Sequence, residues 1–162
     1  SACGSNVKVQ KEFNYNATSY QAKQHSKPSG TLTSSEQNEI VMLSFSLLNT
    51  KYNWGGKHPD FGLDCSGLVS YVFKKAINRN ITGAARHIVK HGKDVPLAQA
   101  QRGNLQPGDL IFFNTTGKPY SHVGIYVGEK KFLHASSGRK KVILSSLDNS
   151  YYKARMERVK RI

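Results

Sequence analysis

Cys65 and two histidines are the residues best suited to carry out chemistry. The chain has two cysteines, Cys3 and Cys65. The segment Asp64-Cys65-Ser66-Gly67 contains residue types that begin helices, and an apolar pattern follows it to Ile77. A buried structural cysteine is the alternative, but these flanks are turn and cap residues. Since N–H groups at a helix start stabilise negative charge, we expect a lowered thiol pKa and a nucleophile at Cys65.

A nucleophilic thiol needs a base, and the base needs a third group that orients it. His122 and His134 lie twelve residues apart on β-rich segments joined by a turn near Gly128. Antiparallel pairing would bring these two histidines close together. His87 and His91 are four residues apart and could share a helix face, but a metal site there lacks third and fourth ligands. We therefore expect no metal.

The expected helices lie in the first part of the chain. Apolar residues at spacings of three and four predict a helix over residues 33–49. It begins with two overlapping capping boxes, which pair Thr33 with Glu36 and Ser34 with Gln37. Further helices are expected over residues 65–77, with Cys65 at the start, and within residues 83–92.

Short β-rich segments separated by tight turns fill the second part of the chain. The expected strands are residues 110–113, 122–127, 131–135, 142–144 and 154–162. Helices followed by hairpin-linked strands indicate an α+β fold with an antiparallel sheet, not alternating βαβ units.

Residues 1–31 are polar and predict a flexible tether before a domain of residues 32–162. The chain starts Ser1-Ala2-Cys3-Gly4, which is similar to the end of a bacterial lipoprotein signal. We therefore expect lipidation of Cys3 and attachment to a membrane; a disulfide between Cys3 and Cys65 is the alternative. No apolar run in the sequence approaches the length of a membrane span.

Composition narrows the class of protein and of partner. The chain has 162 residues, 38% of them hydrophobic, which fits one domain with its own core and excludes a disordered chain. The net charge of +14 favours polyanions such as nucleic acid, anionic lipid or cell-wall polymers. Because the basic residues are spread out and no nucleic-acid motif is present, nucleic acid is not expected as a partner.

Five sequence blocks, in order, resemble those of the NlpC/P60 peptidases. The blocks are Tyr52-Asn53-Trp54-Gly55-Gly56, Asp64-Cys65-Ser66-Gly67, Pro107-Gly108-Asp109-Leu110, His122-Val123-Gly124-Ile125-Tyr126 and His134-Ala135-Ser136-Ser137. The resemblance covers about residues 33–162. It implies a papain-like α+β fold, the peptide part of bacterial peptidoglycan as substrate, and cysteine peptidase chemistry without a metal or organic cofactor.

The resemblance also implies roles for single residues. Cys65 would be the nucleophile, His122 the general base, and His134 the polar residue that orients His122. The hydroxyl of Tyr52 would help to stabilise the oxyanion beside the N–H of Cys65. Hydrolysis would then pass through a thioester between the substrate acyl group and Cys65.

Substrate contacts are implied at three more positions. Asp64 and Ser66 match family residues that contact the amino-terminal side of the substrate. Where many relatives have a Leu-Pro-Arg-Ser/Thr-type segment, this chain has Ile81-Thr82-Gly83-Ala84-Ala85-Arg86-His87-Ile88. Arg86 could replace the missing arginine and meet a substrate carboxylate. The departure leaves substrate preference open.

The cleaved bond would lie within one stem, between D-glutamate and the diamino acid, or across a crosslink, between D-alanine and the diamino acid. The short, lipoprotein-like layout resembles Gram-negative envelope members that cut crosslinks. We expect a monomer at the periplasmic face of the outer membrane. Two alternatives stay open: a catalytically inactive wall-binding scaffold, and an acyltransferase on the same fold.

Overall fold

The computed structural model describes residues 32–162, so the predicted tether and Cys3 lie outside the described part. The helices within it are α1 (Ser34–Ser46), α2 (Cys65–Ile77), α3 (Ala85–Ile88), α4 (Leu97–Gln101) and α5 (Ser150–Arg155). The strands are β1 (Lys57–His58), β2 (Gly62–Leu63), β3 (Lys93–Val95), β4 (Leu110–Phe113), β5 (His122–Gly128), β6 (Lys131–Ser136), β7 (Lys141–Ser146) and β8 (Met156–Arg161). The described region is therefore α+β, as predicted.

Six strands form one antiparallel sheet in the order β3-β8-β4-β5-β6-β7. Strands β5, β6 and β7 are consecutive hairpin neighbours, whereas the last strand, β8, inserts between β3 and β4. Strands β1 and β2 form a separate two-stranded hairpin just before α2. The predicted antiparallel sheet is confirmed, and β4 has the predicted bounds.

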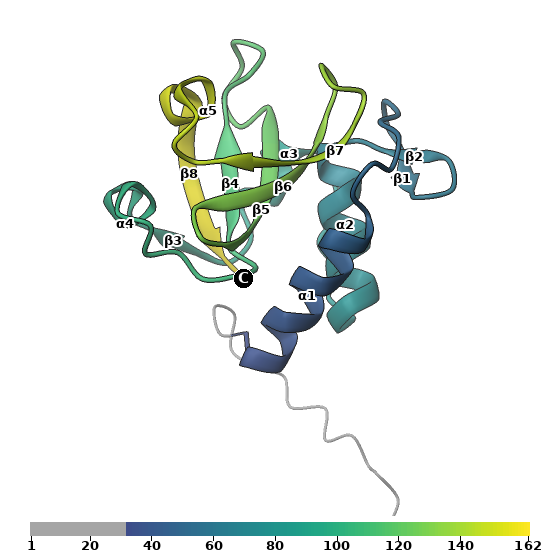
Figure 1. The fold of residues 1–162 in the computed structure, drawn as a ribbon, viewed down its shortest axis with the longest axis horizontal. Helices are drawn as coiled ribbons and strands as arrows, with labels where there is room; N and C mark the ends of the chain where they lie inside the picture. The colour runs from purple at the N-terminus through teal and green to yellow at the C-terminus, as the bar shows by residue number, and fades with distance from the viewer. Residues whose placement is uncertain (1–31) are drawn as a thin grey trace, which may run out of the picture.

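Helices α1 and α2 lie side by side on one side of the sheet (Figure 1). The apolar side of α2 packs on the inward residues of β5 and β6, and this forms the larger core cluster. Its members include Leu68, Val69, Val72, Phe73, Val123, Ile125 and Leu133. The alternate residues of the same strands form a second cluster, which Tyr152 of α5 covers together with Met156.

The helix starts follow the sequence, with two corrections. The Thr33–Glu36 capping box is present. The predicted Ser34–Gln37 box is absent, because the helix begins at Ser34 itself. The side-chain amide of Gln37 instead donates a hydrogen bond to Gln106 Oε1. Helix α3 ends at Ile88, so His91 lies beyond it and the expected shared face with His87 is absent.

Asp109 of the Pro-Gly-Asp block has a structural role. Its buried carboxylate accepts two hydrogen bonds from the guanidinium of Arg161, at 3.0 and 2.9 Å. It also accepts the N–H of Gln106 at 2.8 Å. Such a bidentate pair has fixed geometry, so it holds the end of β8 against the turn that begins β4.

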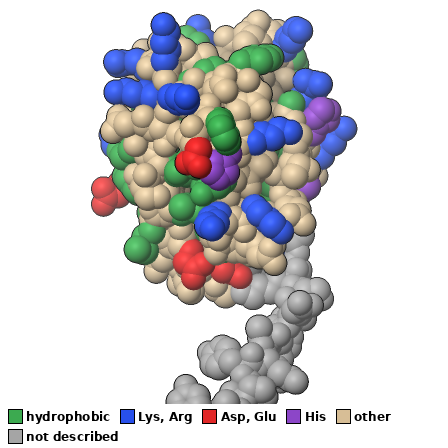
Figure 2. Space-filling view, turned by 90° about the vertical axis from the view of Figure 1, so that its right-hand side faces the viewer, with side chains coloured by type: hydrophobic (Ala, Val, Ile, Leu, Met, Phe, Trp, Pro, Cys, Tyr) green, Lys and Arg blue, Asp and Glu red, His purple; other side chains and the backbone are tan. Residues whose placement is uncertain are grey.

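The exposed surface is basic. Figure 2 looks onto the side of the molecule that carries α2 and the β1–β2 hairpin, and Lys and Arg side chains gather over it. No helix within residues 32–162 has both the length and the hydropathy to cross a membrane.

Candidate active site

Asp64 sets the start of the helix that carries Cys65. Its Oδ1 accepts the N–H of Gly67 at 2.6 Å and the hydroxyl of Ser66 at 3.0 Å. Its Oδ2 accepts the N–H of Gly55 at 3.1 Å. Asp64 therefore caps α2 and ties the Tyr block to it. The structure gives Asp64 and Ser66 a positioning role, and contact with substrate stays a prediction for both.

Two glycines let the Tyr block approach α2 closely. A Cβ at Gly67 would lie 1.9 Å from the carbonyl oxygen of Gly56, and a Cβ at Gly56 would lie 2.2 Å from the carbonyl oxygen of Gly62. Any side chain at either position would collide with backbone. The two glycines thus fix the spacing between the turn after Tyr52 and the nucleophile helix.

Gly67→Ala should lower the free energy of unfolding by about 1–3 kcal/mol, because the clash displaces backbone that cannot rotate away. Urea denaturation measures this change. Gly138→Ala is the matched control, since a Cβ there meets nothing nearer than 3.9 Å, and its effect should stay within about 0.5 kcal/mol. Equal midpoints for the two variants would show that the close approach is not required.

Cys65 is a free, half-buried thiol at the first residue of α2. The nearby backbone N–H groups, those of Val123 and Ser66 above all, favour the thiolate. Burial outweighs them, and with the Asp64 carboxylate it raises the pKa of Cys65 to about 11. The expectation of a lowered pKa is therefore wrong, because desolvation exceeds the effect of the helix start.

His122 and His134 meet across the β5–β6 hairpin as predicted. His122 Nε2 lies 2.8 Å from His134 Nδ1, and His134 Nε2 lies 2.8 Å from Ser145 Oγ on β7. Cys65 packs against the core cluster that contains Val123, the residue after His122. The structure thus joins His122 to His134 and places Cys65 against the cluster beside β5, and proton transfer from Cys65 to His122 stays a prediction.

The two hydrogen bonds of His134 are compatible with one set of tautomers that leaves a basic nitrogen on His122. If His122 is to accept a proton at Nδ1, its Nε2–H must donate to His134 Nδ1. His134 then carries its own proton on Nε2 and donates it to Ser145 Oγ. This order of donors leaves His122 Nδ1 free to act as a base.

The two histidines are held neutral by their surroundings. Burial lowers the pKa of His122 to about 4, and burial together with the charge of His122 lowers the pKa of His134 to about 3. The His134 ring packs between Phe132 and Tyr152, with ring centroids 4.7 and 5.1 Å away. Gly124 makes room for this packing, because a Cβ there would lie 2.7 Å from the Phe132 ring.

Tyr52 lies close enough to Cys65 and Asp64 for both to affect its phenol. Its backbone N–H donates to the carbonyl of Lys140 at 2.9 Å, and its half-buried side chain packs on the larger core. Burial, then the negative charges of Cys65 and Asp64, raise the pKa of Tyr52. The phenol therefore stays protonated and can donate a hydrogen bond to an oxyanion.

Ser145 extends the histidine line and the Tyr152 ring packs on His134, but both residues lie outside every sequence block. Strand register explains Ser145: Ile143 is opposite His134, and Ser145 is two residues further on, at a diagonal position. Alternation along β7 is therefore the signal that could have found it. Nothing in the sequence places Tyr152, because α5 is a six-residue helix capped by Asn149.

The remaining candidates do not join this cluster. Arg86 is exposed on α3 and has no hydrogen bond or ion pair within residues 32–162. The Nδ1 of His87 accepts the N–H of Ala84. In the described part of the chain, no group of three or more His, Cys, Asp or Glu residues could hold a metal.

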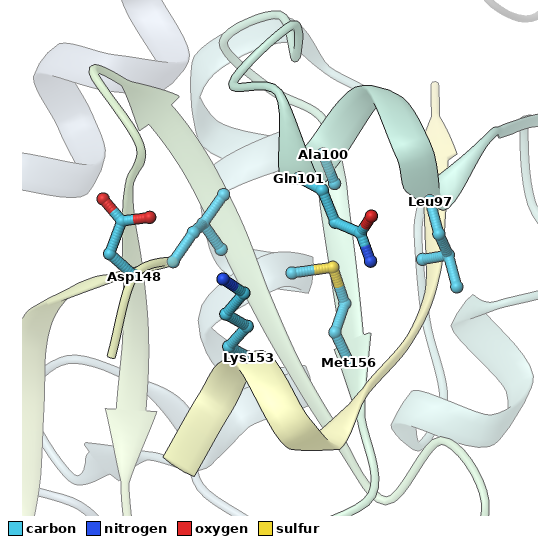
Figure 3. Close-up of a pocket in the computed structure, with 7 residues that line it drawn as sticks. Leu97, Ala100, Gln101, Asp148, Lys153 and Met156 are labelled. Atoms are coloured by element: carbon cyan, nitrogen blue, oxygen red, sulfur yellow. The ribbon is translucent and has the colours of Figure 1, made fainter. Parts of the chain in front are cut away.

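A separate small cavity lies between α4 and α5 (Figure 3). Leu97, Ala100 and Gln101 of α4 face Lys153 and Met156 across it. Its volume of ≈ 40 Å³ holds little more than a water molecule and is far below that of ligand sites, about 300 Å³ or more. We assign it no catalytic role.

Comparison with known proteins gives a consistent family. The sequence matches the NlpC/P60 family over residues 49–161. It is 41% identical over 131 residues to a Haemophilus influenzae protein named "Probable endopeptidase", covering 76% of this chain and 78% of that protein. It is 38% identical over 102 residues to murein DD-endopeptidase MepH of Escherichia coli, covering 62% of this chain and 36% of MepH.

Solved structures of NlpC/P60 proteins are similar to this chain as well. The NlpC/P60 domain of the peptidoglycan hydrolase SagA matches with a TM-score of 0.64 at 27% identity, covering 78% of this chain and 98% of that one. NlpC2 of Trichomonas vaginalis matches with a TM-score of 0.69 at 28% identity, covering 81% of this chain and 48% of that one. This chain belongs to the NlpC/P60 family and has its papain-like fold.

Proposed function

We propose that this protein is a cysteine endopeptidase that hydrolyses the peptide part of peptidoglycan. One observation carries the proposal: Cys65 begins the helix that packs on the strand starting at His122, and His122 is hydrogen-bonded to His134 at 2.8 Å. This arrangement supports the roles of nucleophile for Cys65, base for His122 and orienting group for His134.

Acylation follows from these positions. His122 Nδ1 takes the proton from Cys65 as the sulfur attacks the amide carbonyl, so an S–C bond forms and the oxygen becomes an oxyanion. The hydroxyl of Tyr52 and the N–H of Cys65 stabilise that oxyanion. His122 then gives the proton to the leaving amine, and the C–N bond breaks to leave a thioester.

In deacylation water is the nucleophile and the sulfur of Cys65 is the leaving group. His122 removes a proton from water, and the water oxygen forms a C–O bond with the thioester carbon. The S–C bond breaks, and the proton returns to the sulfur through His122, so the site is regenerated. The whole cycle needs water as its only co-reactant.

We favour the D-alanine–diamino acid bond of crosslinks as the target. Two relatives from Escherichia coli support this choice, because MepH and MepS/murein LD-carboxypeptidase are both named murein DD-endopeptidases. A third is named gamma-DL-glutamyl hydrolase. The chain spans 36%, 55% and 28% of the lengths of these three proteins.

Mass spectrometry of muropeptides after digestion of intact peptidoglycan tests the function and the bond together. We expect crosslinked dimers to decrease and monomers with uncut stems to increase. Stems shortened after D-glutamate would assign the cut to the stem bond instead. Unchanged muropeptides, from protein that circular dichroism shows to be folded, would refute the proposed function.

The charge state of Cys65 predicts how its reactivity depends on pH. Because burial raises the pKa of Cys65 to about 11 and lowers that of His122 to about 4, thiol and imidazole are both neutral at pH 7. The rate of Cys65 alkylation by iodoacetamide should therefore rise about tenfold per pH unit from pH 7 to 10. Mass spectrometry of the Cys65 peptide measures it, using the Cys3 peptide as an internal reference. A plateau from pH 6 upwards would show a thiolate–imidazolium pair instead.

We also propose an envelope location, with Cys3 as the site of a lipid anchor. The lipobox-like start supports it, and an enzyme acting on the wall must reside there. Metabolic labelling with a palmitate analogue should mark the wild type in a bacterial host and leave Cys3→Ser unmarked. Equal labelling of both would exclude Cys3 as the anchor.

A further inference from the structure

A groove of ≈ 450 Å³ runs along the side of α2 that faces away from the core. Lys57 of β1, four α2 residues (Ser70, Tyr71, Lys74 and Lys75) and the loop over residues 80–82 line it. The groove is separate from the cavity in Figure 3 and has the volume typical of a ligand site.

The floor and rim of the groove differ in chemistry. Tyr71 is half-buried, and its ring meets His58 of β1 edge-on at 5.6 Å, so the aromatic floor is held in place. Lys57, Lys74 and Lys75 are exposed around it. Within residues 32–162 none of these three lysines forms an ion pair. Among them only the Lys74 ammonium donates a hydrogen bond to a side chain, at Asn78 Oδ1.

Three unneutralised ammonium groups around one apolar floor favour a ligand that has several anionic groups and an apolar or sugar-like body. The face that carries the groove is basic over a wide area (Figure 2). Nucleic acid and anionic lipid share the negative charge. The position of the groove relative to the nucleophile separates these possibilities.

The groove lies on the same helix as Cys65. Residues 71–75 are six to ten positions further along α2, so the rise of about 1.5 Å per residue places them about 9–15 Å from the nucleophile along the axis. A molecule held at Cys65 that also fills the groove must therefore extend well beyond the reacting bond. A polymer with repeating acidic branches meets that requirement.

We propose that this groove binds the carboxylates of a stem peptide neighbouring the one that is cut, and so recognises polymeric peptidoglycan. The proposal rests on the proposed function and extends it, because it adds a second binding site for the same substrate. A soluble crosslinked dimer, which has no stem beyond the two joined at the cut, would occupy the catalytic site alone and gain nothing from the groove.

Binding to insoluble peptidoglycan, measured by co-sedimentation in a Cys65→Ala background, tests the proposal independently of turnover. The variant combines Lys57→Gln, Lys74→Gln and Lys75→Gln. The matched control combines Lys93→Gln, Lys131→Gln and Lys153→Gln, which are exposed lysines outside the groove, so the net charge changes equally. We expect Kd to rise about tenfold in the groove variant and less than about twofold in the control.

Two further ligands identify the chemistry. Peptidoglycan whose carboxylates have been amidated should bind the parent protein about as weakly as intact peptidoglycan binds the groove variant. Vesicles of anionic phospholipid should bind the groove variant and the control equally. Equal loss in both lysine variants, indifference to amidation, or a loss confined to vesicles would each overturn the proposal.

Activity separates this inference from the proposed function. With Cys65 present, the groove variant should cleave a soluble crosslinked muropeptide dimer at the wild-type rate but cleave intact peptidoglycan with a KM raised about tenfold. A wild type that cleaves neither substrate refutes the proposed function. The co-sedimentation measurements would then still show which ligand the groove binds.

Discussion

Cys65→Ala should reduce cleavage of peptidoglycan by at least about 10⁴-fold, because Cys65 is the one thiol within residues 32–162 on which the thioester can form. The fold should persist, since Cys65 is half-buried and alanine suits the first turn of α2. Release of soluble muropeptides from intact peptidoglycan, at matched concentrations of folded protein, measures the loss. Retained cleavage would remove Cys65 from the mechanism.

Cys65→Ser and Cys3→Ser sharpen this result. A serine hydroxyl needs a stronger base than a thiol, and the lowered pKa of His122 makes it a weak one, so Cys65→Ser should be nearly as inactive as the alanine variant. Cys3→Ser removes the other thiol and should leave cleavage of isolated peptidoglycan unchanged. Inactivation by Cys3→Ser would mean that residues before the domain take part in the reaction.

His134→Ala should lower kcat by about 10²–10⁴-fold with little change in KM, because His122 would lose the acceptor that selects its tautomer. The substitution empties a fully buried position between Phe132 and Tyr152, so the folded fraction must be measured alongside. Steady-state kinetics on a soluble muropeptide separate the two constants.

His134→Asn is the matched variant that tells orientation from packing. The Oδ1 of asparagine is as many bonds from the backbone as the Nδ1 of histidine, so it can accept the Nε2–H of His122 from the same place. Asparagine is also the third residue of other cysteine peptidases with this type of site. We expect His134→Asn to recover most of the kcat lost in His134→Ala, although both variants lose the contact with Ser145. Equal kcat values would reduce His134 to a packing residue.

The sequence predicts the long elements well and the short ones poorly. The capping box at Thr33 and the apolar repeats of α2 are local signals, and hairpin turns mark β5 to β7, so these elements could be predicted. Strands β1 and β2 have two residues each, which is too short for any periodicity. Helix α4 has five residues and no side-chain cap, so it too left no pattern.

In the candidate site, too, some features could be predicted from the sequence and others could not. His122 and His134 could be paired from their spacing, because a hairpin fixes which residues meet. The pKa of Cys65 could not be predicted, because its sign depends on how deeply β5 and α2 bury the sulfur. Ser145 depends on the register of a third strand, and Tyr152 on a helix that packs from the other face of the sheet.

A neutral third residue has a consequence for the transition state. When His122 takes the thiol proton it becomes an imidazolium, and His134 offers it an uncharged acceptor in place of a carboxylate. The positive charge is balanced mainly by the sulfur and the developing oxyanion. The site therefore favours a proton that moves together with the attacking sulfur over one that rests on His122 beforehand.

The carboxylate of Asp64 has a wider consequence for how sequences of this kind can diverge. It joins the block that holds the nucleophile to the block that holds Tyr52, through the N–H groups of Gly67 and Gly55. Selection at Asp64 therefore acts on folding whatever the substrate is. Retention of the Asp64-Cys65-Ser66-Gly67 motif by itself does not identify the substrate. A lineage can acquire a new substrate while keeping this motif, by altering exposed positions such as Lys74 and Arg86.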